Sequence, residues 1–212
     1  MYPRGVDPQI LLAWLSARSL ARRLPPPVPE HGGFRVDTNS ADEIARWVFP
    51  KIGPGLKRLA RSITESRYLL KLCGAPDELQ AALPTAWQLH APAYFMRARS
   101  EPTVTQLAEG YRIESTLGGQ VSEARIFCQT GVLAASGYAA ETDQVFVYDR
   151  IITQPDHRRN GLGSALMAAL HAAKRHRDNP ELLVATQDGR SLYSALGWET
   201  ISPYSTASIF NP

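Results

Sequence analysis

The sequence predicts a mixed α/β fold of the α+β kind, in which helices flank a mostly antiparallel central sheet. Short apolar or alternating runs, separated by glycines, fill residues 93–153 in the manner of antiparallel hairpins. Residues 145–185 follow the order strand, glycine turn, helix and strand. Residues 1–92 are richer in helical patterns, so we expect a helix-rich N-terminal subdomain beside a core at 93–212. A chain of 212 residues is long enough for both.

Composition excludes several classes of protein. The 23 basic and 20 acidic residues leave a net charge of only +3, which is too small to indicate a nucleic-acid partner. Two cysteines, Cys73 and Cys128, make neither a disulfide framework nor a cysteine-rich zinc site, and they suit the cytoplasm. The apolar run 10–15 is too short to cross a membrane, and no cleavage pattern of a signal peptide accompanies it. We therefore expect a cytoplasmic protein with no membrane partner.

The first expected helix begins at Asp7, as its cap, with Pro8 in the first helical position. Apolar residues then recur at helical spacing until the prolines 25–27 end the helix. The arginines of this helix are expected mainly on the opposite side. We expect it to pack against the rest of the fold, and a contact that makes a homodimer stays open as the alternative.

The rest of the N-terminal region alternates strands and helices. Strands are expected at 34–36 and 68–72. Helices are expected after Ser40, from near Pro54, and from Pro76 to near Pro84. The first of these helices is predicted because Ser40 and Glu43 have the spacing of a capping box.

The C-terminal region has a more regular pattern. Strands are expected at 94–96, 111–113, 124–127, 132–135 and 145–153. A helix from Gly161 to about Arg175 follows, then an apolar strand at 182–185. A short helix ended by Gly197 precedes further strands at 198–209.

The glycine turn before the helix at 161–175 has the chemistry of a phosphate site. A helix N-terminus offers unpaired N–H groups and a favourable dipole, and Gly161 and Gly163 let an anion approach the backbone. Arg158 and Arg159 add charge next to it. No Gly-Lys-Ser/Thr follows, which excludes a P-loop, and the antiparallel surroundings argue against a dinucleotide fold.

The stretch 145–209 resembles the GNAT superfamily of N-acetyltransferases. Arg158-x-x-Gly161-x-Gly163 matches that family's Arg/Gln-x-x-Gly-x-Gly/Ala motif, and residues 151–155 resemble its fourth strand and the exit from it. Residues 192–198 resemble its later Leu-Tyr-x-x-x-Gly-Phe segment, with Trp198 in place of Phe. The resemblance covers roughly the C-terminal half, and it implies a GNAT-type core at 93–212.

This resemblance implies transfer of an acetyl group from acetyl-CoA to a primary amine of a small molecule by direct attack, without a metal. The main chain of Ile151, Ile152 and Thr153 would pair with the pantetheine arm. The pyrophosphate would be held by Arg158, Arg159, Asn160, Gly161, Leu162, Gly163 and Ser164. Tyr193 would be catalytic by protonating the leaving thiolate, and its alternative is a core aromatic. No His/Asp/Glu spacing suggests a metal site.

The general base is the weakest part of the resemblance. Family members often place a glutamate in the fourth strand, where this chain has Val147. Asp149 lies two residues further and projects from the same face, so it is the candidate catalytic base. It would equally bind the substrate ammonium or pair with an arginine, and Glu141 is a rival. The uncertain base keeps a non-catalytic acyl-CoA-binding sensor as the alternative function.

Residues 1–92 are expected to contribute to the acceptor site. If 111–113 is the first strand of the core, too little chain remains before 124 for the two helices that GNAT proteins usually have there. The N-terminal region then either covers that face or supplies missing pieces, and the resemblance allows it to be a degenerate half-domain of the kind known in relatives. Trp87, His90 and Tyr94 are candidates for lining the cleft, and buried packing is their alternative.

Overall fold

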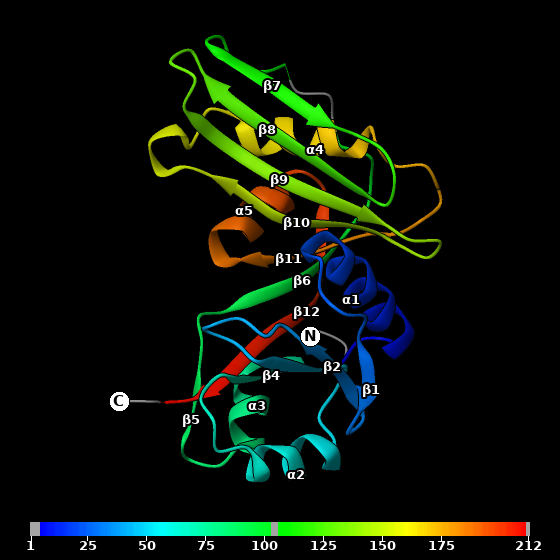
Figure 1. Ribbon diagram of the computed structural model, residues 1–212, viewed down its shortest axis with the longest axis vertical. Helices are drawn as coiled ribbons and strands as arrows, with labels where there is room; N and C mark the ends of the chain where they lie inside the picture. The colour runs from blue at the N-terminus through cyan, green and yellow to red at the C-terminus, as the bar shows by residue number, and fades with distance from the viewer. Residues whose placement is uncertain (1–4, 103–105, 211–212) are drawn as a thin grey trace.

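One twisted sheet runs through the whole molecule (Figure 1). The computed structural model describes residues 5–102 and 106–210. Within them the strand order is β1-β2-β3-β4-β12-β6-β11-β10-β9-β8-β7, and β5 pairs with β12 beside that path. The pairs are antiparallel apart from β3 with β4, β10 with β11 and one isolated bridge. The predicted mixed, mostly antiparallel fold with flanking helices is confirmed.

The elements have the following bounds. The strands are β1 (Val28–Glu30), β2 (Gly33–Asp37), β3 (Ala45–Phe49), β4 (Tyr68–Cys73), β5 (Trp87–Leu89), β6 (Ala93–Ala98), β7 (Tyr111–Thr116), β8 (Val121–Cys128), β9 (Leu133–Glu141), β10 (Phe146–Thr153), β11 (Glu181–Thr186) and β12 (Trp198–Ile209). The helices are α1 (Pro8–Arg22), α2 (Pro54–Ser62), α3 (Pro76–Ala82), α4 (Leu162–His171) and α5 (Gln187–Ala195), with a 3-10 turn η1 (Pro155–His157).

The two ends of the sheet repeat one pattern. Three antiparallel strands are followed by a helix, a parallel strand and a shorter helix, once as β1-β2-β3-α2-β4-α3 and once as β8-β9-β10-α4-β11-α5. The centre is shared: β6 pairs with β11, while β12 pairs first with β6 and then with β4 and β5. We infer that the N-terminal part is the degenerate half-domain considered above, joined to the other half by a continuous sheet.

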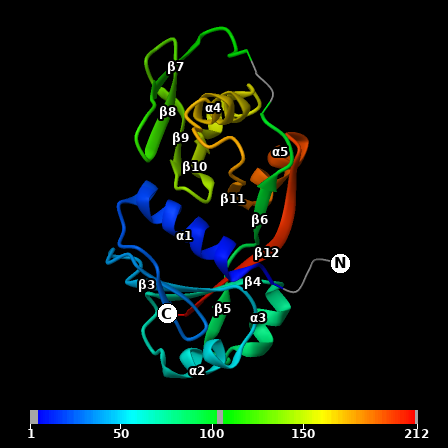
Figure 2. The same cartoon turned by 90° about the vertical axis from the view of Figure 1, so that its right-hand side faces the viewer.

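Helices cover both faces of this sheet (Figure 2). Helix α1 lies across the centre of one face, where it packs on residues such as Phe95 and Leu182. On the other face, α4 and α5 cover Met96 and Leu183, and α2 and α3 cover the strands of the N-terminal half. The strand period of two sends neighbouring side chains to opposite faces. The N-terminal region therefore supplies, as α1, the cover for one face of the C-terminal half.

Helix α1 begins as predicted, with Asp7 Oδ1 accepting from Gln9 N at 2.7 Å, and it ends at Arg23 in the left-handed conformation. The expected place of its arginines is wrong for two of them. Trp14, Arg18 and Arg22 follow each other at four-residue spacing, so they lie along one side of the helix. That side faces the sheet because both arginines bind Asp149.

The predicted helix after Ser40 is absent from the described chain, where residues 40–43 form a turn into β3. Ser40 Oγ does accept from Glu43 N at 3.0 Å, as a capping box requires, but Ser40 N donates back to Glu43 O at 2.8 Å and closes the turn. Trp47, Val48 and Phe49 then favour a strand, since aromatic and β-branched residues fit a pleated sheet. Two further differences are that α4 ends at His171 and that 198–209 is one long strand.

Docking of α1 is expected to be a main source of stability. Leu11 of this helix is fully buried against the rest of the fold, whereas Gln9 of the same helix is exposed. Leu11→Ala should lower the free energy of unfolding by about 3 kcal/mol, because it removes buried methyl groups and leaves a cavity. Gln9→Ala, measured alongside by denaturant unfolding, should change it by less than about 0.5 kcal/mol. Equal effects would mean that α1 is not packed as described.

Candidate active site

The site begins where β10 separates from β11. The two strands pair in parallel only at Phe146 with Glu181 and Val147 with Leu182. Beyond that point β10 has an irregularity between Asp149 and Ile152, with Arg150 at φ 52°. A bulge bends a strand and ends its pairing on one side. The next residues of β10 and β11 therefore diverge and leave main-chain groups without a strand partner between them.

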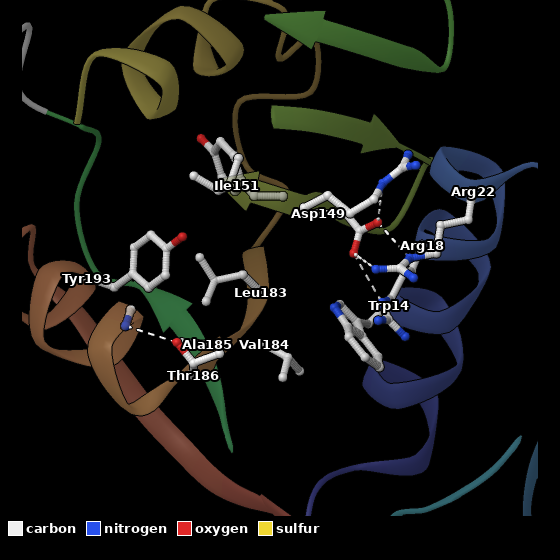
Figure 3. Close-up of a pocket in the computed structure, with 13 residues that line it drawn as sticks. Trp14, Arg18, Arg22, Asp149, Ile151, Leu183, Val184, Ala185, Thr186 and Tyr193 are labelled. Carbon is white, nitrogen blue, oxygen red and sulfur yellow. Dashed lines mark hydrogen bonds and ion pairs between the residues drawn. The ribbon is translucent and has the colours of Figure 1, made fainter. Parts of the chain in front are cut away.

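A pocket of about 250 Å³ occupies this opening (Figure 3). Strand β10 lines it with Tyr148, Asp149, Arg150 and Ile151, and β11 lines it with Leu183, Val184, Ala185 and Thr186. Helix α5 contributes Gly189 and Tyr193, and α1 contributes Trp14, Arg18 and Arg22. The pocket thus joins the open strand edge to a helix from the other end of the sequence.

The corresponding place in the N-terminal half is closed. Strands β3 and β4 pair without interruption from Ala45 to Phe49, so they do not diverge. Its glycine turn, at the start of α2, is also covered: a Cβ on Gly55 would lie 1.7 Å from the carbonyl oxygen of His31 in the β1–β2 turn. Only the C-terminal half combines an open strand pair with an open glycine turn.

The predicted phosphate cradle lies at the start of α4. Gly161 caps the helix in the left-handed conformation, at φ 71°, and a Cβ there would meet no atom within 4 Å. The first helical hydrogen bond is from Ala165 N to Gly161 O, at 3.1 Å. The N–H groups of Leu162, Gly163 and Ser164 therefore precede the helical bonding pattern and suit an anion. Arg158 and Arg159, also exposed, stand before them.

The two glycines of the motif serve different purposes. A Cβ on Gly163 would lie 2.8 Å from Leu192 Cδ2, so this glycine allows α4 to pack closely against α5. Asn160 shapes the turn: its Nδ2 donates to the carbonyl oxygens of His157 at 3.2 Å and of Arg158 at 3.4 Å. The open, anion-facing position of the motif is therefore Gly161.

Strand β10 presents the predicted cofactor-binding main chain at its open end. Ile152 and Thr153 pair with β9 on one side, and Ile152 is 50% exposed. Ile151 lies within the irregular stretch, where its Cδ1 approaches Gly137 so closely that a Cβ there would be 2.4 Å away. Gly137 thus leaves room for the distortion that opens β10.

Tyr193 lies on α5 and lines the pocket opposite β10 (Figure 3). Its ring packs on Trp198 with 5.8 Å between ring centres, and it is 6% exposed. Burial raises the pKa of Tyr193, so its hydroxyl keeps its proton well above neutral pH. The packing of a core aromatic, which was the alternative for Tyr193, is therefore present, and its hydroxyl still bears a proton where the residue lines the pocket.

Asp149 is tied to three arginines, two of them from α1 (Figure 3). Its Oδ1 accepts from Arg18 Nε at 3.2 Å and from Arg22 Nη2 at 2.9 Å. Its Oδ2 accepts from Arg22 Nε at 2.7 Å and lies 3.2 Å from Arg150 Nε. Pairing with arginine was one of the three roles open to Asp149, and it is the one that the contacts favour.

These contacts make Asp149 a poor proton acceptor. Burial alone would raise the pKa of Asp149, but the charges and hydrogen bonds of Arg18 and Arg22 outweigh it and lower the pKa. A carboxylate held in this way stays ionised, and taking a proton would break its ion pairs. The geometry therefore favours a positioning role, in which Asp149 fixes the three guanidinium groups.

The ion pairs of Asp149 should be visible as a pH-dependent stability. Because its pKa is lowered on folding, their contribution is fully present above the ordinary carboxyl value near pH 4 and is lost as the pH falls below that value through the lowered pKa of the folded state. Asp149→Asn should lower the free energy of unfolding by about 3 kcal/mol at pH 7 and by progressively less as the pH falls below about 4, the ordinary carboxyl value. Denaturant unfolding across pH checks this, with exposed Asp42→Asn as control. A loss that does not change with pH would contradict it.

The rival base lies outside the pocket. Glu141, at the end of β9, accepts from the backbone N–H groups of Arg175 and His176 and from the Arg175 side chain. These bonds anchor the chain between α4 and β11. Burial alone would raise the pKa of Glu141, but the hydrogen bonds outweigh it and lower the pKa. Glu141 is thus a structural carboxylate.

Of the three N-terminal candidates, none lines the pocket. Trp87 is buried under α2 and donates from Nε1 to Ala60 O at 3.0 Å. His90 lies 2.8 Å from Ser208 Oγ at β12, and Tyr94 OH donates to Gln187 at the start of α5. The N-terminal residues that do reach the pocket come from α1, and their four-residue spacing was the available signal.

Other polar residues near the site have structural partners. Thr186 lines the pocket and caps α5 by accepting from Gly189 N at 3.2 Å. His157 Nδ1 lies 3.0 Å from Tyr111 OH, and His171 lies within 3.2 Å of Glu181. Across residues 5–102 and 106–210, no group of three or more His, Cys, Asp or Glu side chains is placed to hold a metal ion. In the same ranges, no helix is both long and apolar enough to cross a membrane.

Comparison with known proteins shows which protein family the open half of the sheet matches. Residues 121–200, which contain the bulged strand, the glycine turn and α5, match the family model for the acetyltransferase (GNAT) domain. Residues 121–200 are a GNAT acetyltransferase domain. The family typically uses acetyl-CoA. No curated protein matches the chain in sequence.

Solved structures of GNAT proteins share the fold over the whole chain. A GCN5-related N-acetyltransferase from Kribbella flavida aligns with a TM-score of 0.64 at 15% identity, covering 99% of this chain and 98% of that one. A putative GNAT acetyltransferase from Novosphingobium aromaticivorans gives 0.61 at 15% identity, covering 97% and 100%. A tandem GNAT protein from the clavulanic acid biosynthesis pathway gives 0.56 at 14% identity, covering 85% and 79%.

Proposed function

We propose that the protein is an N-acetyltransferase that moves an acetyl group from acetyl-CoA to the amine of a small molecule. The observation that carries the proposal is the opening of β10 from β11 between the glycine turn and Tyr193. Residues 158–164 would hold the pyrophosphate, and the free edge of 151–153 would pair with the pantetheine arm. With the cofactor held in this way, the thioester would lie at the pocket, next to Tyr193.

The residues of the pocket suit direct attack of the amine on the thioester carbonyl. Unpaired main-chain N–H groups at the opening of β10 would stabilise the negative charge that develops on the carbonyl oxygen. Tyr193, which keeps its proton at neutral pH, would give it to the departing thiolate. Asp149 stays ionised and holds the arginines, so the amine has to lose its proton before attack without this carboxylate as base.

Acetyl-CoA turnover with a panel of primary amines tests the proposal. Release of free coenzyme A thiol should depend on an added amine, and the acetylated amine should be detectable by mass spectrometry. Binding of coenzyme A is measured in parallel by calorimetry. Tight binding with no turnover on any amine would instead favour a non-catalytic acyl-CoA sensor, for which the ion-paired Asp149 is the supporting observation.

A further inference from the structure

Helix α1 brings an unused hydrogen-bond donor to the pocket. Trp14 is 1% exposed and lines the pocket, and its indole N–H has no acceptor among the described residues. Its ring is fixed by Phe95 and Tyr204, at 5.0 and 5.8 Å between ring centres. A buried donor without an acceptor is costly, so it calls for an acceptor oxygen from outside the chain.

Arg18 stands next to this donor and has hydrogen-bonding capacity to spare. Its guanidinium carbon lies 5.2 Å from the centre of the Trp14 ring. It donates to Asp149 through Nε, which leaves its two terminal nitrogens for another acceptor. Arg22, in contrast, uses both Nε and Nη2 on Asp149. Trp14 and Arg18 therefore form a pair of adjacent donors on one side of α1.

The pocket is also electropositive. Three guanidinium groups, of Arg18, Arg22 and Arg150, surround the single carboxylate of Asp149, which leaves two positive charges in excess. The excess extends toward the N-terminal half: burial, together with the charges of Arg46 and Arg18, lowers the pKa of Lys71 to about 7. An anionic group is what such a site attracts, and the low dielectric of a small pocket strengthens the attraction.

We propose that the acceptor is an amine that also carries a carboxylate, and that Arg18 and the Trp14 indole N–H bind this carboxylate. The inference rests on the proposed function and names its acceptor class. A guanidinium fork fits the two oxygens of a carboxylate, and the pocket volume of about 250 Å³ suits a small molecule. Held at the α1 side, the carboxylate would direct the amine toward Tyr193.

The same charges would help the amine to react. An ammonium group that enters this pocket meets burial and the one positive charge that stays in excess after the carboxylate of the acceptor is bound, and both favour its neutral form. Lys71 gives the precedent within this chain, since burial and neighbouring arginines lower its pKa. Only the neutral amine has the lone pair that attacks the thioester. The arginines thus hold one end of the acceptor and favour the neutral form of the other, whose proton passes to water before attack; this offsets the absence of a carboxylate base.

Matched acceptor pairs test the inference. We would compare lysine with cadaverine and phenylalanine with phenethylamine, where each pair differs by the carboxylate, and include an aminophosphonate. The wild type should show at least about 100-fold higher kcat/KM for the carboxylated member of the preferred pair. A preference for the phosphonate over the carboxylate would overturn the carboxylate assignment, and equal use of both members of each pair would overturn the anion site itself.

Three variants complete the test. Arg18→Gln and Trp14→Phe, which keeps an aromatic ring but lacks the N–H, should each raise the KM for the carboxylated acceptor about 10- to 100-fold and that for the bare amine by a much smaller factor. Arg23→Gln, at an exposed position of the same helix end, is the control and should change neither. Equal losses for both members of a pair would show a structural role and contradict the inference.

Calorimetric binding of the acceptors with coenzyme A present separates the two proposals. Selective binding of the carboxylated member, lost in Arg18→Gln but without turnover in the wild type, would support the carboxylate site and refute the acetyltransferase function. Turnover without any preference for a carboxylate would support the acetyltransferase function and refute the carboxylate site.

Discussion

Gly161→Asp is expected to abolish cofactor binding. Position 161 is the left-handed N-cap of α4, and its Cβ side is open space next to the free N–H groups of Leu162, Gly163 and Ser164. A carboxylate there would stand where the pyrophosphate is proposed to bind, and it would itself accept hydrogen bonds from these N–H groups. The Kd for coenzyme A, measured by calorimetry, should rise at least about 100-fold from charge repulsion and competition.

Gly161→Asn is the matched control for this prediction. Asparagine has nearly the shape of aspartate and tolerates the left-handed conformation, but it carries no charge. It should cost about tenfold or less in coenzyme A binding, and both variants should have similar melting temperatures. If Gly161→Asp binds coenzyme A as the wild type does, the pyrophosphate is not held at this turn.

Tyr193→Phe is expected to lower kcat by about 100- to 10,000-fold with little change in the KM for acetyl-CoA. The variant keeps the ring that packs on Trp198 and removes only the proposed proton donor. Because burial raises the pKa of Tyr193, the wild-type rate should not fall on the alkaline side below about pH 10 through loss of this proton. Steady-state kinetics from pH 6 to 10 measure both features.

A structural control accompanies this variant. Trp198→Phe changes the aromatic neighbour of Tyr193 without touching the hydroxyl, so it should affect stability more than kcat. Full turnover by Tyr193→Phe at every pH would remove Tyr193 from the proposed mechanism.

Local sequence patterns were sufficient for the glycine turn before α4 and for most elements. Asp7 with Pro8, Pro54 and Pro76 mark helix starts that the structure confirms, because the signals lie within one turn of the backbone. The signal at Ser40 and Glu43 was misleading because the same serine bond closes a turn before a strand. Whether this hydrogen bond caps a helix or closes a turn depends on the residues that follow, and here they form a strand.

The long-range parts of the site were beyond such patterns. Asp149 and Arg22 are far apart in the sequence, and no property of β10 alone tells which partner its carboxylate finds. The same holds for Trp14: the apolar spacing of its helix predicts that it is buried, but it does not predict that it lines the pocket. Which half of the sheet opens also depends on the bulge in β10. At that bulge Ile151 packs closely on Gly137 of β9, and these two residues are not neighbours in the sequence.

The pairing of β12 with strands from both halves of the sheet has a consequence for how the chain folds. Strand β4 receives one neighbour, β3, from its own half, but its other edge is covered by Tyr204–Ala207 of β12, which is synthesised last among the strands. During synthesis, β4 therefore keeps a row of unpaired backbone groups until β12 has left the ribosome. Such non-local pairing slows folding, and the waiting edge is where a nascent chain would be most exposed to wrong pairing or to a chaperone.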